Sequence, residues 1–212
     1  MDKVKFYKCD VTTDDLNTAF DDVVQRFGYI DVIINNAGIM NDSKNVYVKA
    51  IQVNVIALIN SSLKAYELMR KDRNGKGGTI INISSIAALG KSCPLPVYSA
   101  TKSAVLQFSQ CLGMEPTYSR TGVRVLIICF GCTNTSLLHE SKYGVFDPEV
   151  LELLTEYFNN TIKQKLESAV RGMLEAYKNG ASASTWLIMA DQPAQDITVY
   201  VPDVNKTMKS SS

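Results

Sequence analysis

A tyrosine and a lysine four residues apart carry the clearest chemical signal in this 212-residue sequence. On a helix, Tyr98 and Lys102 would share one face and lie one turn apart. An ammonium beside a phenol favours the phenolate, so Lys102 is expected to lower a phenol pKa that is otherwise about 10. The pair therefore predicts an acid/base group that works near neutral pH. Taken alone, the same spacing more often marks an ordinary pair on the surface of a helix.

Polar residues in a fixed order before this pair change that interpretation. Ser85 precedes Tyr98 by thirteen residues, and Asn54 precedes Ser85 by thirty-one. The sequence Asn-Asn-Ala-Gly at 35–38 follows an apolar segment, and small residues there let the backbone approach a ligand at the carboxyl end of a sheet. Each feature has an ordinary alternative: a serine bonded to local backbone, a buried amide in a helix, or a simple turn.

The segments that must position these residues alternate between strand and helix. Hydrophobic patterning predicts strands at 4–9, 30–34, 79–84, 123–129 and 185–189. It predicts helices at 12–28, 45–70 and 97–118, a further helix that begins at 147, and a helical stripe from 162 to 177 that ends at 180. A capping box is expected at Thr12–Asp15, an N-cap at Asp147, and a bend or early end at Pro116. This alternation predicts one α/β domain over residues 1–212 with a mostly parallel sheet.

The composition excludes several classes of partner. A net charge of +1 gives no long-range attraction to nucleic acid, so none is expected as a partner. No apolar run approaches the roughly 20 residues that cross a bilayer, so no membrane partner is expected. Five scattered cysteines without an N-terminal signal segment predict reduced thiols and a cytoplasmic protein. The Cys129-x-x-Cys132 pair lacks a second ligand pair, and His139 is the only histidine, so no metal site is expected.

Six motifs fall in one order along the chain. They are Cys9-Asp10-Val11, Asn-Asn-Ala-Gly at 35–38, Asn54, Asn-Ile-Ser-Ser at 82–85, Tyr98-x-x-x-Lys102 and Gly131-x-x-x-Thr135. This ordered set resembles the short-chain dehydrogenase/reductase family over nearly the whole chain. It is most similar to the 15-hydroxyprostaglandin dehydrogenase-like and insect alcohol dehydrogenase-like branch. The resemblance implies a Rossmann-like parallel sheet with helices on both faces, and an NAD-dependent oxidoreductase.

The resemblance also implies catalytic roles. Tyr98 would be the general acid/base, and Lys102 would lower its pKa and hydrogen-bond the cofactor ribose. Ser85 would hold the substrate oxygen near the phenol, and Asn54 would hold a water that relays protons between Lys102 and solvent. Hydride transfer is the chemistry of the cofactor, whereas the protein supplies positioning and proton transfer.

Cofactor contacts follow from the same resemblance. Asp10 and Val11 would contact the adenine, although Asp10 also fits a cap at the entry of a helix. The other implied cofactor residues are Asn36, Ala37, Gly38, Tyr98, Lys102, Gly131, Thr133 and Thr135. The expected cofactor is NAD. NADP stays open, because the family segment that carries the distinguishing acidic residue has no counterpart here.

The sequence departs from the family at its N-terminus. The family opens with a strand, a glycine-rich turn and a helix that holds the pyrophosphate, and nothing here matches them. We therefore expect an N-terminally truncated dinucleotide-binding domain, without the first βαβ unit, that binds dinucleotide poorly by itself. The 4–9 strand would lack its neighbours, and the 30–34 strand would have an open edge. Phe130 stands where the family has proline, which would shift the loop beside the nicotinamide.

The expected reaction is oxidation of a secondary alcohol or reduction of a ketone. Segment 137–158 is rich in Leu, Tyr and Phe. As an apolar lid it would favour a small hydrophobic substrate, although these side chains fit packing on the sheet equally well. The resemblance implies a homodimer or homotetramer that pairs through the helices carrying Asn54 and Tyr98. The alternative is a catalytically inactive relative that serves as an interaction or dimerisation module. The sequence does not specify the particular substrate.

Overall fold

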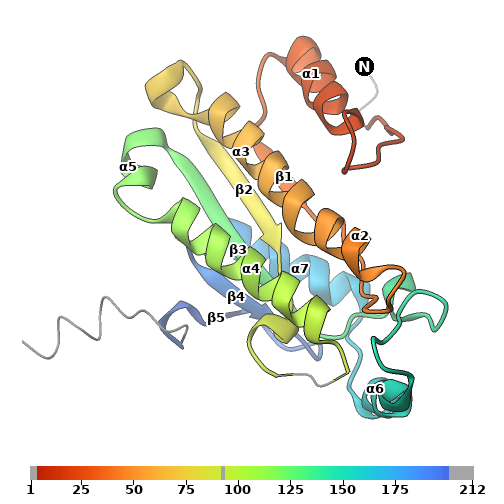
Figure 1. Cartoon of the computed structure of the whole chain (residues 1–212). Coiled ribbons are helices and arrows are strands. Elements are labelled where there is room, and N and C mark those ends of the chain that lie inside the picture. The colour runs from red at the N-terminus through yellow and green to blue at the C-terminus, as the bar shows by residue number, and fades with distance from the viewer. Residues whose placement is uncertain (1–3, 92–93, 201–212) are drawn as a thin grey trace, which may run out of the picture.

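The fold is built on a five-stranded sheet, which the computed structural model describes within residues 4–91 and 94–200 (Figure 1). The strands lie in the order β1-β2-β3-β4-β5, and the first four run parallel while β5 is antiparallel to β4. Their bounds are β1 (Val32–Asn35), β2 (Gly78–Ile83), β3 (Val123–Phe130), β4 (Thr185–Ile188) and β5 (Gln195–Asp196). Parallel strands need crossover connections, and helices supply all three of them.

Helices cover both faces of the sheet, as predicted. Their bounds are α1 (Asp15–Phe27), α2 (Tyr47–Ile51), α3 (Leu58–Met69), α4 (Pro96–Gly113), α5 (Thr117–Thr121), α6 (Leu151–Asn160) and α7 (Leu166–Asn179). In Figure 1, α3 and α4 lie in front of the sheet and α7 lies behind it. No helix in the described part of the chain is both long and apolar enough to cross a membrane.

Alternate residues of the central strands face the two helix layers. Ile80 and Val125 are buried in one apolar cluster with Met69 of α3, whereas Ile81 belongs to a second cluster with Ala176 of α7. The pleat points successive side chains to opposite faces, and both faces here are covered. This is why β2 and β3 are nearly continuous apolar runs in the sequence.

Residues 4–9 do not form the predicted strand. The segment is irregular, and Val4 and Phe6 are 85% and 86% exposed. A strand needs a ladder partner, and among the described residues no strand lies beside the outer edge of β1. The segment instead contacts α1, where the Tyr7 hydroxyl donates to the Asp22 carboxylate.

The predicted 45–70 helix is continuous but not uniform. α2 leads directly into a π-helical segment, η1 (Gln52–Ala57), which leads into α3. Short π-helical segments inside α-helices occur frequently at functional sites. Asn54 lies within η1, so the irregularity coincides with a predicted catalytic residue.

Other helix boundaries differ from the prediction in detail. The 97–118 helix ends at Gly113, and Pro116 stands immediately before α5. Asp147 caps as expected, accepting a hydrogen bond from Glu149 N at 3.1 Å, but the first turn is a short 3-10 helix, η5 (Pro148–Val150). The Thr12–Asp15 capping box does not form, because no side chain caps the start of α1.

A buried polar network joins the carboxyl ends of β1 and β2. Asn35 Nδ2 donates to Asn82 Oδ1 at 2.8 Å and to Ser62 Oγ at 3.0 Å, and the two asparagines are register partners. Asn82 Nδ2 donates to Ser109 Oγ of α4 at 2.8 Å. Asn82, Ser62 and Ser109 are fully buried, where polar groups cost stability unless they are hydrogen-bonded. The network therefore fixes the positions of α3 and α4 relative to the carboxyl ends of β1 and β2.

Replacing Asn82 with alanine is expected to lower the free energy of unfolding by about 2–4 kcal/mol, because Asn35 and Ser109 lose a buried partner. Urea denaturation followed by circular dichroism measures the change. The control is Asn60→Ala on the exposed side of α3, which should cost less than about 0.5 kcal/mol. Equal losses in the two variants would contradict the role given to the network.

Candidate active site

The carboxyl ends of β1 and β2 bring several predicted residues to one edge of the sheet. The 36–42 loop follows β1, and Ser85 comes two residues after β2. Asn36, Ala37 and Gly38 are exposed at this edge. A methyl group on Gly38 would lie 3.6 Å from Asn54 Oδ1 and 3.7 Å from Lys102 Nζ. Three separate motifs therefore meet at Gly38.

Ser85 lies beside Tyr98, and its side chain opposes the rise that burial causes in the pKa of the phenol. Both are buried, with exposed fractions of 8% and 7%. The Ser85 hydroxyl also accepts a hydrogen bond from Ala87 N at 3.1 Å, which caps the short 3-10 helix η3 (Ile86–Ala88). The Ser85 side chain thus caps η3 and also lies beside Tyr98, where the sequence predicted it.

The pKa of Tyr98 is shifted in the direction opposite to the prediction. Burial raises the pKa of the phenol to about 12, the Ser85 hydrogen bond opposes this rise, and the charge of Cys132 adds to it. Lys102 Nζ lies 5.7 Å from the centroid of the Tyr98 ring. Desolvation is the largest cause of the rise, and Lys102 is not among its causes. In this arrangement the phenol keeps its proton.

Lys102 is buried without a carboxylate partner among the described side chains. It is 5% exposed, and its Nζ donates to Ile83 O at 2.9 Å. Burial lowers the pKa of the ammonium to about 8, and the charge of Cys129 opposes this shift. An ammonium carries three donors, and the described residues accept one of them. Lys102 can therefore donate further hydrogen bonds to a ligand.

Asn54 is fully buried and its side chain is hydrogen-bonded. Its Oδ1 accepts from Ile39 N at 2.8 Å, and its Nδ2 donates to Ile39 O at 2.8 Å and to Thr101 Oγ1 at 3.1 Å. These bonds tie η1 to the loop after β1 and to α4. An amide oxygen can accept two hydrogen bonds and Oδ1 accepts one here, so the relay water expected at Asn54 stays a prediction.

Asp10 and Val11 lie beside the helix of residues 52–63. Asp10 Oδ1 accepts from Thr12 N at 3.0 Å and from Thr12 Oγ1 at 2.7 Å, and these two bonds lower the pKa of its carboxyl. Val11 lines a cavity of about 580 Å³ whose other lining residues come from 12–17 and 52–63. Tyr98 does not line this cavity. The carboxylate of Asp10 thus bonds its own turn, while Val11 faces open space.

The loop that follows β3 is hydrogen-bonded to the end of β4 and packs closely against it. Gly131 N donates to Ile188 O at 2.9 Å, and a methyl group on Gly131 would come within 2.5 Å of Met189 Cβ. Thr133 Oγ1 donates to Gly131 O at 3.0 Å, while Thr135 is exposed. Phe130 stays in β3 and pairs with Ile188.

Segment 137–158 covers Tyr98 and does not pack on the strands. Leu154 and Phe158 of α6 form a buried apolar cluster with Tyr98, Met40 and Leu95, and the partly buried side chains around it include Tyr143 and Val145. The Tyr143 and Phe158 rings lie 5.2 Å apart. The segment therefore packs beside Tyr98, and its role as a substrate lid stays a prediction.

Sequence reasoning missed two buried polar residues that support the site. Gln164 is fully buried, and its Nε2 donates to Thr133 Oγ1 at 2.9 Å and to Ile188 O at 3.0 Å. Asp42 is 1% exposed and accepts from the backbone of α4. Both contacts span long stretches of sequence, so no local pattern marked them. Within the described ranges, no three His, Cys, Asp or Glu side chains lie close enough to hold a metal ion.

Comparisons with known proteins find dehydrogenases. The short chain dehydrogenase family matches residues 1–144. Alcohol dehydrogenase 2 of Ceratitis cosyra is 39% identical over 184 residues, which cover 84% of this chain and 69% of that protein. The 15-hydroxyprostaglandin dehydrogenase (NAD(+)) of Rattus norvegicus is 37% identical over 137 residues, which cover 64% of this chain and 51% of that protein. A solved short-chain dehydrogenase from Streptomyces avermitilis is similar in fold, with a TM-score of 0.71 at 22% identity over 97% of this chain and 75% of that one.

Lys102→Met is expected to change how stability depends on pH. The pKa of Lys102 is about 8 in the folded chain against an ordinary 10.5. Between these values the unfolded chain binds a proton that the folded chain does not, so the wild-type protein gains stability as pH rises. From about pH 7 to about pH 9.5 the gain should be about 2 kcal/mol, and it should be absent in Lys102→Met.

Urea denaturation at a series of pH values tests this prediction. Lys178→Met, on the exposed side of α7, is the matched control and should keep the wild-type dependence. A wild-type dependence in Lys102→Met would show that another group titrates.

Proposed function

The chain belongs to the short-chain dehydrogenase family, and we propose that it transfers hydride between NAD and a secondary alcohol or the corresponding ketone, with Tyr98 as the general acid/base. One observation carries the proposal. Ser85, Tyr98 and Lys102 lie together: the Ser85 side chain acts on the pKa of the Tyr98 phenol, and Lys102 Nζ lies 5.7 Å from the centroid of the Tyr98 ring. The name of the rat relative includes NAD(+), which supports NAD as the cofactor.

The residues of the site fit a ribose and a nicotinamide. Lys102 has donors to offer to ribose hydroxyls, and Gly38 leaves the space beside this ammonium free of a side chain. The proposed contacts are Asp10 and Val11 for the adenine, Asn36 for the adenosine ribose, and Lys102 for a ribose hydroxyl. Gly131, Thr133 and Thr135 would contact the nicotinamide half, and Ala37, Gly38 and Tyr98 complete the cofactor site. When bound, the nicotinamide accepts or donates the hydride.

Protein side chains transfer the proton and position the groups that exchange it. Tyr98 Oη takes the hydroxyl proton when an alcohol is oxidised and returns it when a ketone is reduced. Ser85 holds the substrate oxygen by a hydrogen bond. A charged Lys102 favours the phenolate, against the burial that disfavours it. The Asn54 side chain bonds Ile39 and Thr101, and a relay water at this residue would donate to the second lone pair of its Oδ1.

The surroundings of Tyr98 favour an apolar substrate. The side chains packed around the phenol are aliphatic, aromatic or sulfur-containing: Met40, Leu95, Leu154, Phe158, Tyr143 and Cys132. Ser85 is the polar side chain that acts on the phenol. A pocket with mostly apolar walls and a few polar groups orients the reacting oxygen and leaves the rest of the substrate to hydrophobic contact.

Tyr98→Phe is expected to abolish turnover while cofactor binding persists, because phenylalanine keeps the ring and removes the acid/base oxygen. NADH formation from 2-octanol at saturating NAD+ measures turnover, and NADH fluorescence measures binding. Tyr29→Phe is the control: Tyr29 is an exposed tyrosine in contact with Lys76, and its variant should keep wild-type turnover. Retained turnover in Tyr98→Phe would refute the assigned role.

A series of secondary alcohols tests the substrate class. From 2-butanol to 2-octanol, kcat/KM should rise about fourfold for each methylene group that the apolar cluster buries. Leu154→Ala should flatten the rise, because Leu154 is 1% exposed in that cluster. Leu153→Ala is the matched control, since Leu153 is next to Leu154 in the sequence and is itself 51% exposed. A series that is flat in the wild-type protein would exclude a hydrophobic substrate.

A further inference from the structure

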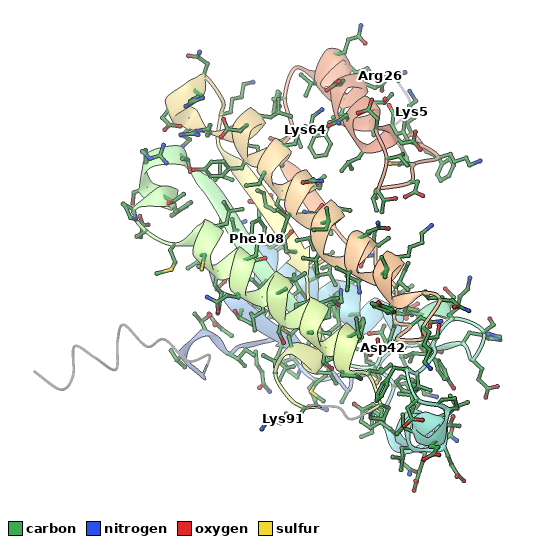
Figure 2. The ribbon with its side chains drawn as sticks, in the orientation of Figure 1. Lys5, Arg26, Asp42, Lys64, Lys91 and Phe108 are labelled. Atoms are coloured by element: carbon green, nitrogen blue, oxygen red, sulfur yellow. The ribbon has the colours of Figure 1, made fainter. Side chains whose placement is uncertain are left out.

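We propose that Asp42 is a positioning residue for Tyr98: its carboxylate fixes the first turn of α4, and its backbone joins that turn to the lid. The inference rests on the proposed role of Tyr98. Figure 2 shows Asp42 at the end of α4 where the helix begins. The reaction would therefore depend on a side chain that lies 56 residues away from Tyr98 in the sequence.

The carboxylate of Asp42 binds two backbone groups of α4. Val97 N donates to Oδ2 at 2.6 Å, and Tyr98 N donates to Oδ1 at 2.9 Å. The first N–H groups of a helix have no acceptor within the helix. Since α4 begins with Pro96, which has no N–H, Val97 and Tyr98 supply the first two such donors. Asp42 satisfies both of them.

No residue next to α4 in the sequence performs this role. Leu95 stands at the N-cap position, and no side-chain hydrogen bond is made from it. Serine, threonine, aspartate or asparagine normally caps a helix from that position. A carboxylate at a helix N-terminus is also favoured by the helix dipole, and its bonds to N–H groups are charge-assisted. Asp42 thus replaces the missing local cap from a distant loop.

The same residue is joined to the lid through its backbone. Asp42 N donates to Gly144 O at 2.9 Å, and Asn41 and Gly144 form a parallel β-bridge. The contact is close, since a methyl group on Gly144 would lie 2.5 Å from Asn41 Oδ1. Tyr143 and Val145 flank Gly144 and pack at the cluster around Tyr98. A displacement of Asp42 would therefore move the lid and the phenol together.

The negative charge of the Asp42 carboxylate is stabilised by these two N–H groups. The side chain is 1% exposed, and none of the described cationic side chains forms a salt bridge with it. Burial raises the pKa of the Asp42 carboxyl, and the bonds from Val97 N and Tyr98 N lower it. An amide in place of the carboxylate has the same shape but one acceptor oxygen, and its NH2 group would face an N–H donor.

Amide hydrogen exchange tests the contact without any cofactor. In the wild-type protein, the Val97 and Tyr98 amides should exchange far more slowly than the first-turn amides of α7, which has no side-chain cap. In Asp42→Asn, exchange at Val97 and Tyr98 should be faster by about tenfold or more, while Leu106 in the middle of α4 is unaffected. Asp31→Asn, an exposed aspartate before β1, is the matched control and should leave these amides unchanged.

Turnover tests the consequence for the reaction. Asp42→Asn should lower kcat by about tenfold to a hundredfold while the dissociation constant for NADH stays within about twofold of wild type, because only the placement of the phenol changes. Asp31→Asn should keep both values. An equal loss of kcat and NADH affinity would indicate general damage and overturn the proposal.

The failure of this inference is distinguishable from the failure of the proposed function. A wild-type protein that oxidises no alcohol would refute the function, and the amide exchange would still decide whether Asp42 holds Tyr98. Unchanged exchange in Asp42→Asn would overturn the positioning role. If that variant does not fold, the wild-type comparison decides: Val97 and Tyr98 amides that exchange as fast as the first turn of α7 would overturn it as well.

Discussion

The site depends on the register in which β1 and β2 end. Asn35 and Asn82 are direct partners across the two strands and are also hydrogen-bonded through their side chains at 2.8 Å. A slip of either strand by one residue would turn its asparagine to the opposite face of the sheet and break the amide pair. The loops that follow carry Gly38 and Ser85. This amide pair therefore sets the relative positions of the two loops that carry Gly38 and Ser85.

Burial and charge oppose each other within the site. Burial removes water from Tyr98 and Lys102, which raises the pKa of the phenol to about 12 and lowers that of the ammonium to about 8. Both shifts favour the neutral forms, whereas acid/base chemistry needs a phenolate beside a cation. The covered site thus resembles a resting state. Ligands that add hydrogen bonds or displace the apolar cover would bring the two groups toward their working charges.

Local chemistry made much of this fold and site predictable. Apolar runs marked β2 and β3 because both of their faces are buried, and the spacing of Tyr98 and Lys102 placed them on one helix face. Other features depend on contacts that no local pattern contains. Residues 4–9 have the composition of a strand but no ladder partner among the described residues, and Asp42 reaches α4 across 56 positions. The pKa of Tyr98 was predicted in the wrong direction because spacing reveals an adjacent charge but not the depth of burial.

The π-helical segment limits how the long helix between β1 and β2 can vary in length. Each residue turns a helix by about 100°, so inserting or deleting one rotates everything beyond it. Asn54 must face Ile39 on one side of η1, while Ala65 and Met69 must face the sheet farther along. The wider turn of η1 lets Asn54 face Ile39 while Ala65 and Met69 face the sheet. Deleting one residue from α3 before Ala65 would therefore turn Ala65 and Met69 by about 100° relative to Asn54 and away from the sheet.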